Sequence, residues 1–167
     1  MKKLSKRIIA MLLIVSSIFS VFSVSACSSA TEPNENIVLE KITTFHETVV
    51  SSQKCLDIIA DDIYSNWYNA IYNDKYYGSI DLAIAYALED NEENLNSIKA
   101  NEPIIQSLYK EIRDSELEKE IKAVMSAYSD YYEFVVNVSG SFNSFSASKE
   151  TLKKELASAL KDLALEI

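Results

Sequence analysis

The chain of 167 residues contains only two glycines and two prolines. Sheets that are joined by tight turns need more of both, because glycine supplies positive φ angles and proline fixes the turn backbone. Their scarcity argues against a fold of many short strands and favours long helices with few connections. Hydrophobic residues make up 48% of the sequence, which is enough for the core of a single domain.

Residues that carry common chemistry are equally scarce. The single histidine, His46, cannot build the usual zinc site without cysteine or carboxylate ligands at suitable spacing. A di-iron bundle would need Glu-x-x-His pairs on two helices. The sequence also has no Gly-x-Ser-x-Gly elbow and no glycine-rich phosphate loop. We therefore expect no cofactor and no enzymatic activity, and we expect His46 to be a surface or half-buried residue.

Positive charge is in deficit. The chain has 16 Lys and Arg against 25 Asp and Glu, a net charge of −9. Nucleic-acid binding depends on Lys and Arg contacts to phosphates, so this composition argues against a nucleic-acid partner. It also disfavours direct attraction to anionic lipid headgroups. A membrane association would therefore need an anchor other than surface charge.

The first 27 residues have the order of a secretory leader. Lys2, Lys3, Lys6 and Arg7 are followed by a mostly apolar run over residues 8–22, and small residues then lead to a cysteine. The closing segment Val24-Ser25-Ala26-Cys27 resembles the lipobox of bacterial lipoproteins. In that family the cysteine receives a diacylglycerol and the chain is cut just before it. The resemblance implies a signal peptide over residues 1–26 and lipidation at Cys27.

Two other interpretations of the leader stay open. One is an ordinary secreted signal peptide whose cleavage site precedes a cysteine by chance. The other is a transmembrane helix, although the apolar run is short for a span and contains several serines. The lipoprotein interpretation places the protein at the extracytoplasmic face of the cell membrane, held in the bilayer through acylated Cys27. Residues 27–36 then form a short polar tether.

The rest of the chain, residues 37–167, predicts an all-α domain. Apolar residues step by four and three along the sequence, which is typical of helices packed nearly along one another. We expect an up-down antiparallel bundle of about four main helices with one additional short helix. The main helices are expected over about residues 37–73, 90–114, 115–138 and 142–163, and the short one over 80–89.

Several residues mark the expected helix ends. Gly78 suits a left-handed stop, and Ser79 suits the N-cap of the next helix. Asp90 with Glu93 and Ser115 with Glu118 have the spacing of capping boxes. Pro103 should either kink its helix or lie in a first turn after Asn101. The segment 139–141 should separate the last two helices.

The most unusual pattern is aromatic. Tyr64, Tyr68, Tyr72 and Tyr76 recur every four residues, with Trp67 between them. Tyr64, Trp67, Tyr68 and Tyr72 form a possible partner surface, because Tyr and Trp offer large contact area at low entropy cost. Within this set Trp67 should lie at the flank of the buried seam, and Tyr68 should point most directly outward. The alternative is that the 80–89 segment covers the rings with Ile80, Ile84 and Tyr86.

These features favour a membrane-anchored helical interaction module that binds another envelope protein. One alternative is an envelope inhibitor or immunity-type lipoprotein, which would act in phage exclusion or toxin protection. A weaker alternative is a lipoprotein that binds a small ligand. If Cys27 is acylated, Cys55 has no cysteine partner in the chain, and we expect it to be a buried free thiol.

Overall fold

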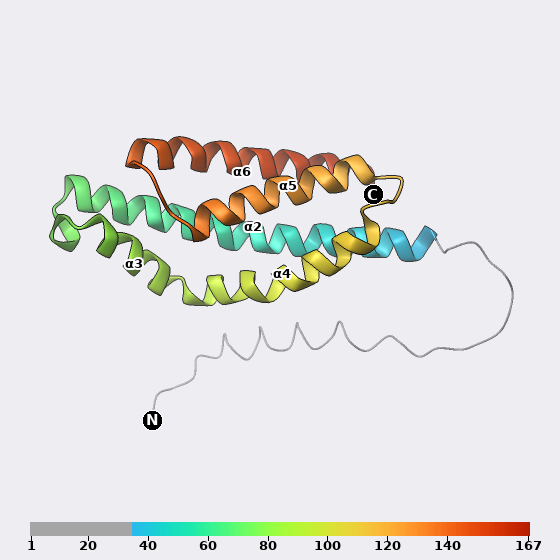
Figure 1. Cartoon of the computed structure of the whole chain (residues 1–167), viewed down its shortest axis with the longest axis horizontal. Coiled ribbons are helices and arrows are strands. Elements are labelled where there is room, and N and C mark those ends of the chain that lie inside the picture. The colour runs from blue at the N-terminus through green and yellow to red at the C-terminus, as the bar shows by residue number, and fades with distance from the viewer. Residues whose placement is uncertain (1–34) are drawn as a thin grey trace, which may run out of the picture. The chain divides into compact units, whose positions relative to one another are not determined.

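The computed structural model describes residues 35–167, which form five α-helices and one short 3-10 helix and contain no strand (Figure 1). The predicted all-α fold is confirmed. In chain order the elements are α2 (Glu35–Tyr72), η1 (Lys75–Gly78), α3 (Ile80–Asp90), α4 (Glu92–Ile112), α5 (Glu118–Val136) and α6 (Phe142–Ala164). The predicted leader and lipidation site, with most of the tether, lie outside the described residues. No helix within residues 35–167 is both long and apolar enough to cross a membrane.

The helices form an up-down bundle around α2. Figure 1 shows α3 and α4 returning along α2, α5 running back again and α6 reversing once more. Helix α2 contacts each of the other four α-helices, whereas α4 and α6 do not contact one another. We call the end with the α2–α3 and α5–α6 connections the tip. The opposite end, with the first turn of α2, the α4–α5 connection and the C-terminus, is the base.

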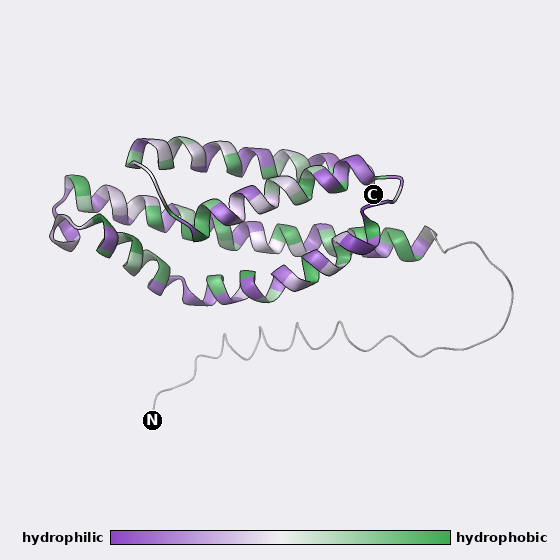
Figure 2. Ribbon diagram, in the orientation of Figure 1, coloured by the Kyte–Doolittle hydropathy of each residue, from purple (hydrophilic) through white to green (hydrophobic). Residues whose placement is uncertain are grey.

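The buried side of α2 follows the predicted four-three spacing. Apolar residues recur along each helix among hydrophilic ones (Figure 2). Most residues of α2 that were expected to face inward are buried: Ile42, Phe45, Val49, Leu56, Ile59, Ile63 and Ala70. Val38 is only half-buried, and Trp67 rather than the expected Asn66 fills the buried position between Ile63 and Ala70. Ser52 interrupts this series and is also buried, and its hydroxyl accepts a hydrogen bond of 3.1 Å from Asn101 Nδ2. The described residues form one compact unit with a continuous core of their own, as expected of a segment that folds by itself.

The helix ends at the tip agree with the sequence in part. Gly78 has φ +70°, the left-handed conformation that glycine adopts without strain, but it ends η1, whereas α2 ends at Tyr72 and is followed by the left-handed Asp74. Ser79 caps α3, because its hydroxyl accepts a hydrogen bond of 3.3 Å from the Leu82 amide. Ser141 and Ser144 form a reciprocal capping box at the start of α6. The segment before α6 therefore separates the last two helices as predicted.

Both predicted capping boxes further along the chain are wrong. Asn91, not Asp90, precedes α4, and its side chain makes no cap bond. Instead, Asn91 Nδ2 donates to Asp62 Oδ2 at 2.7 Å, so this amide joins two helices. Helix α5 begins at Glu118 after Leu117, again without a side-chain cap. Ser115 is too early in the chain to cap it, because its carbonyl accepts from the Glu118 amide in a tight turn.

Two boundaries differ from the prediction in smaller ways. Helix α2 begins at Glu35, so the last two residues of the predicted tether are helical. Pro103 lies inside α4, because this helix already begins at Glu92, well before Asn101. A first turn after Asn101 is therefore wrong, and the helix continues through the proline.

Candidate functional site

The aromatic row of α2 divides into a buried and an exposed part. Trp67 is only 3% exposed and contacts Phe142 and Phe145, with ring centroids 6.0 and 5.4 Å away. Trp67 therefore belongs to the core, and the prediction that it forms part of a partner surface is wrong. Tyr68 and Tyr72 are 43% and 60% exposed, and their ring centroids lie 4.6 Å apart. These two tyrosines are therefore available for contacts outside the bundle.

Phe142, the first residue of α6, partly covers this row. Its ring centroid lies 5.0 Å from that of Tyr64, 6.2 Å from that of Tyr68 and 6.3 Å from that of Tyr72. The 80–89 segment covers only part of the row, because Ile80 and Ile84 line a hollow together with Trp67. Tyr86 of that segment lies beside Tyr76 instead, with centroids 5.5 Å apart. The actual cover comes from a residue 70 positions away from Tyr72 in the sequence.

Tyr64 is held in place from a second side. Lys149 Nζ lies 4.7 Å from the Tyr64 ring centroid and 2.6 Å from Asp61 Oδ1. Burial disfavours the ammonium form, but the hydrogen bonds and negative charges of Asp61 and Glu150 together outweigh it and raise the pKa of Lys149. Lys153 adds an ion pair of 3.3 Å with Asp57. These contacts join α6 to α2. The half-buried Tyr64 therefore contributes to packing between the two helices and is less available to an outside partner.

The turn after α2 is strained and presents one further tyrosine. Asp74, Tyr76 and Tyr77 have φ angles of 51°, 57° and 54°, a region that residues other than glycine rarely adopt. Tyr76 is fixed there, because its hydroxyl donates to Asn66 Oδ1 at 3.0 Å. Tyr77 points outward and is 97% exposed. Sequence reasoning missed Tyr77, since spacing along a helix carries no information about a residue in a turn.

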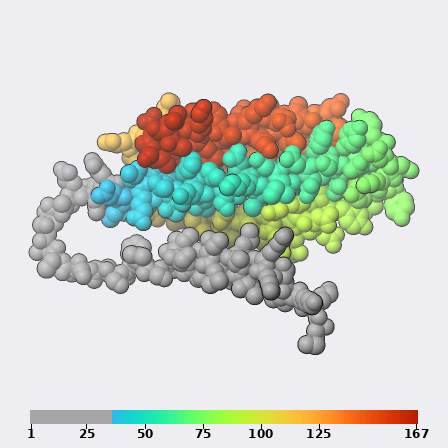
Figure 3. All heavy atoms as spheres, turned by 180° about the vertical axis from the view of Figure 1, so that it is seen from behind, coloured from blue at the N-terminus to red at the C-terminus, as the bar shows by residue number. Residues whose placement is uncertain are grey.

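We call Tyr68, Ile71, Tyr72 and Tyr77 the aromatic tip. The end of α2 and the turn that follows it form this end of the molecule (Figure 3, green). Within residues 36–167, the exposed aromatic side chains are Tyr68, Tyr72, Tyr77 and Tyr86, all between residues 68 and 86. Single exposed hydrophobic residues are common, but a cluster of exposed aromatic residues on one part of a surface is typical of an interaction site.

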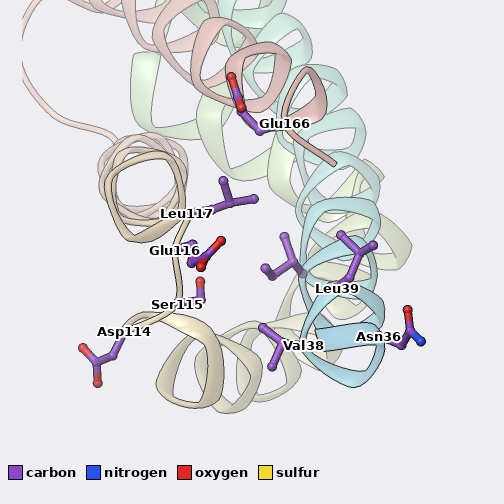
Figure 4. Close-up of a pocket in the computed structure, with 9 residues that line it drawn as sticks. Asn36, Val38, Leu39, Asp114, Ser115, Glu116, Leu117 and Glu166 are labelled. Atoms are coloured by element: carbon purple, nitrogen blue, oxygen red, sulfur yellow. The ribbon is translucent and has the colours of Figure 1, made fainter. Parts of the chain in front are cut away.

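Hollows lie at both ends of the bundle, and one of them, of about 320 Å³, lies between α5 and α6 at the base. We call two others the tip hollow and the base hollow. The tip hollow has a volume of about 440 Å³ and is lined by Trp67, by Ile80 and Ile84 of α3 and by residues 138–140. The base hollow is larger, about 560 Å³, and lies between the start of α2 and the α4–α5 connection (Figure 4). The tip hollow and the base hollow are each lined by a residue with a buried polar atom that has no hydrogen-bond partner among the described residues. These atoms are Trp67 Nε1 at the tip and Ser115 Oγ at the base.

The middle of the bundle contains buried phenols rather than a reactive site. Tyr128 and Tyr131 donate hydrogen bonds to Glu102 Oε2 at 2.8 Å and to Asp57 Oδ1 at 2.9 Å. Burial and the neighbouring carboxylates raise the pKa of both phenols above the usual value of 10.0. Both therefore remain neutral hydrogen-bond donors that join α5 to α4 and to α2.

His46 and Cys55 show no features of a reactive site. His46 is half-buried, and its Nε2 lies 3.2 Å from the Leu160 carbonyl oxygen, so the ring bridges α2 and α6. Cys55 is a free, half-buried thiol, and burial raises its pKa and so disfavours the reactive thiolate. In the part of the chain that the structure describes, no three His, Cys, Asp or Glu residues are grouped closely enough to hold a metal.

Comparison with known proteins assigns no family, because no family model, no curated protein and no solved structure matches the chain. The function has to be argued from the residues themselves. The aromatic tip is the feature that the packing of the bundle does not explain, because its rings remain exposed after the core is complete.

Proposed function

We propose that the chain is a lipid-anchored lipoprotein at the extracytoplasmic face of the cell membrane, and that it binds another envelope protein through the aromatic tip. It acts as an interaction module and not as an enzyme. The observation that carries this proposal is the location of the exposed aromatic residues. Among residues 36–167 they all lie between Tyr68 and Tyr86.

The placement of the tip suits an anchored binding protein. The predicted tether joins the bundle at the start of α2, and the aromatic tip lies at the other end of the same helix. Helix α2 has 38 residues, which corresponds to a length of roughly 57 Å at the usual rise per residue. A partner can therefore reach the tip without displacing the predicted anchor at Cys27.

The chemistry of the tip favours a protein partner. Aromatic residues are enriched at protein interfaces, where tyrosine adds a large apolar area and a hydroxyl at small entropic cost. The net charge of −9 disfavours both nucleic acid and anionic lipid as ligands. The surrounding turn holds Tyr77 outward in spite of its left-handed φ, and such preorganisation before a partner arrives reduces the cost of binding.

Site-specific cross-linking in the producing bacterium tests the partner site. A photo-reactive amino acid replaces Tyr77 at the tip, and a matched variant carries it at Leu165, which is 73% exposed and lies at the base. We expect a defined protein adduct from position 77 that position 165 does not give. The adduct should disappear when Tyr72→Ala is added, because that change removes a neighbouring contact and leaves the core intact. Identical adducts from both positions would contradict the proposal.

A separate experiment tests the anchor. The full chain and its Cys27→Ala variant are expressed in bacteria with labelled fatty acid, and the cells are fractionated. We expect label and membrane association in the original chain, and loss of both in the variant. Equal distribution of the two forms, with no label in either, would exclude lipidation at Cys27 and leave the tip proposal to the cross-linking result.

A further inference from the structure

The base hollow has the size and the walls of a small-molecule site. Its volume of about 560 Å³ falls within the range of about 300–1,000 Å³ that is usual for ligand pockets. Val38, Leu39 and Ile42 of α2 and Leu117 of the α4–α5 connection supply apolar walls. Figure 4 shows Val38 pointing from α2 toward the connection and Leu117 pointing back toward α2. The hollow is therefore an apolar gap between two segments that are fixed by the bundle.

The polar groups of the hollow are acidic and incompletely paired. Asp114, Glu116 and Glu166 all line it. Asp114 lies 3.4 Å from Arg113 Nε, but Glu116 and Glu166 have no ion-pair partner within residues 35–167. The hydroxyl of Ser115 is buried beside them and has no hydrogen-bond partner among the described residues. A buried polar atom without a partner is rare in folded proteins and calls for an explanation.

The local sequence makes this arrangement more informative. Ser115 and Glu118 have the spacing of a capping box, which would satisfy the serine hydroxyl and stabilise α5. The structure leaves the cap unmade and directs Ser115 into the wall of the base hollow. A departure from a local rule without a visible structural gain is expected at functional sites. Here the departure occurs at the base hollow, which is larger than the tip hollow.

We infer that the base hollow binds an alkylammonium compound, a primary amine that carries a short apolar chain. The chain would lie against Val38, Leu39 and Leu117, and the cationic amine would lie near Glu116 and Glu166. The buried Ser115 hydroxyl would have to turn out of the wall to accept a hydrogen bond from the ammonium group. A fatty acid would bring its carboxylate toward Glu116 and Glu166, and like charges repel. The inference does not depend on the aromatic tip.

Nuclear magnetic resonance of a fragment of residues 28–167 tests this inference. The probes are butyl-, hexyl- and octylammonium, with octanoate as the control of opposite charge. We expect saturable shifts of the Ser115, Glu116 and Leu117 amides. The indole N–H of Trp67, the single tryptophan, lies at the other end and should not shift. Each added methylene should tighten binding by up to about fourfold, which corresponds to about 0.8 kcal/mol.

Three variants separate the charge from the walls. Glu116→Gln should weaken octylammonium binding about two- to fivefold, the usual range for an exposed ion pair. Leu39→Gln should weaken the octyl compound more than the butyl compound, because it removes apolar wall from an exposed position. Asp81→Asn, which changes a carboxylate of the tip hollow, is the matched control and should have no effect. Circular dichroism confirms that each variant is folded.

Equal binding of octanoate, an unchanged affinity in Glu116→Gln, or shifts at Trp67 of the same size would each overturn the inference. The amine can be a soluble compound or the headgroup of a lipid, and vesicle flotation distinguishes these sources. Flotation of the fragment with phosphatidylcholine vesicles only when phosphatidylethanolamine is present, and its loss in Glu116→Gln, would assign the headgroup. Binding of octylammonium without such flotation would assign a soluble amine.

Discussion

The tip and the base of the bundle are both made of connections between antiparallel helices, yet they are built in opposite ways. At the tip, Ser79 and Ser141 cap the helices that begin there. At the base, α5 begins without a side-chain cap and Ser115 is left unpartnered. The exposed hydrophobic side chains also differ. They are mainly tyrosines at the tip, and aliphatic residues such as Leu39 and Leu165 at the base.

The ends also differ in how charge complements the helix dipoles. Helices α4 and α6 end at the base with Lys110 and Lys161 in their last turns. Helices α2 and α5 end at the tip with no basic residue in the last turn. Long cationic side chains stabilise a helix C-terminus, but their stems also cover neighbouring apolar surface. Their absence from the last turns of α2 and α5 leaves the tyrosines of the tip uncovered, so the comparison supports a contact surface there.

The largest expected effect separates the two sides of the aromatic row. Trp67→Ala should lower the free energy of unfolding by about 3–5 kcal/mol, because it leaves a cavity in the core. Tyr72→Ala, one turn further along the same helix, should change it by less than about 0.5 kcal/mol. Denaturant unfolding of residues 28–167 measures both. A small effect at Trp67 would mean that the tip is loosely packed and that the division into core and contact residues is wrong.

An alkaline titration tests the layer that separates the two ends. The folded pKa values of Tyr128 and Tyr131 are raised above the unfolded value of about 10. Their contribution to stability is therefore complete below about pH 10 and is lost as the pH rises toward the folded values. Above about pH 10, each phenol should lower the free energy of unfolding by up to about 1.4 kcal/mol per pH unit.

The control for this titration is Tyr131→Phe, which removes one of the two phenols. Its stability should fall less steeply with pH than that of the original chain, whatever its stability at neutral pH. Lys149, whose pKa is also raised, contributes in the same direction in both proteins. Identical slopes for the two proteins would show that Tyr131 ionises freely and that the middle of the bundle is open to water.

A pair of serine substitutions compares the ends directly. Ser141→Ala at the tip should cost about 1 kcal/mol, the usual value of a lost N-cap. Ser115→Ala at the base should be neutral or stabilising by up to about 1 kcal/mol, because it removes a buried hydroxyl that has no partner. Thermal unfolding of both variants measures the difference. An equal loss at both positions would mean that Ser115 caps α5 after all, and would remove one argument for the base hollow.

The parts of the fold that sequence predicted are those set by repeating local patterns. The four-three spacing identified the buried side of α2, because a helix with one apolar side must turn that side toward its neighbours. Ser79 marked the start of α3, because an N-cap acts through its own backbone neighbourhood. These signals need no knowledge of distant residues.

The candidate sites depended on distant residues and were predicted less well. The cover over Tyr64 and Tyr72 comes from Phe142, whose position follows from the path of α6 and not from any spacing within α2. The capping box at Ser115 failed because the chain continues in a tight turn as far as Leu117. Tyr77 was missed because its positive φ is imposed by the turn as a whole, and its residue type does not favour that conformation.

The smallest expected effect concerns this tyrosine. Tyr77→Gly should leave stability unchanged or raise it by roughly 0.5 kcal/mol. The change relieves about 1–2 kcal/mol of left-handed strain, and the greater freedom of glycine in the unfolded chain offsets part of that gain. Tyr68→Gly is the matched control, because it makes the same replacement at an exposed position of ordinary helical conformation. It should cost about 1 kcal/mol.

The same variant should lose its partner. With the photo-reactive residue at position 72, Tyr77→Gly should abolish the tip-specific adduct even though the domain is as stable as before. Binding would then explain why Tyr77 occupies a strained position, because the fold is at least as stable without this side chain. If Tyr77→Gly destabilises the domain as much as Tyr68→Gly, the turn is not strained. If the adduct persists, Tyr77 is not part of the contact, and the partner surface contracts to Tyr68, Ile71 and Tyr72 on α2.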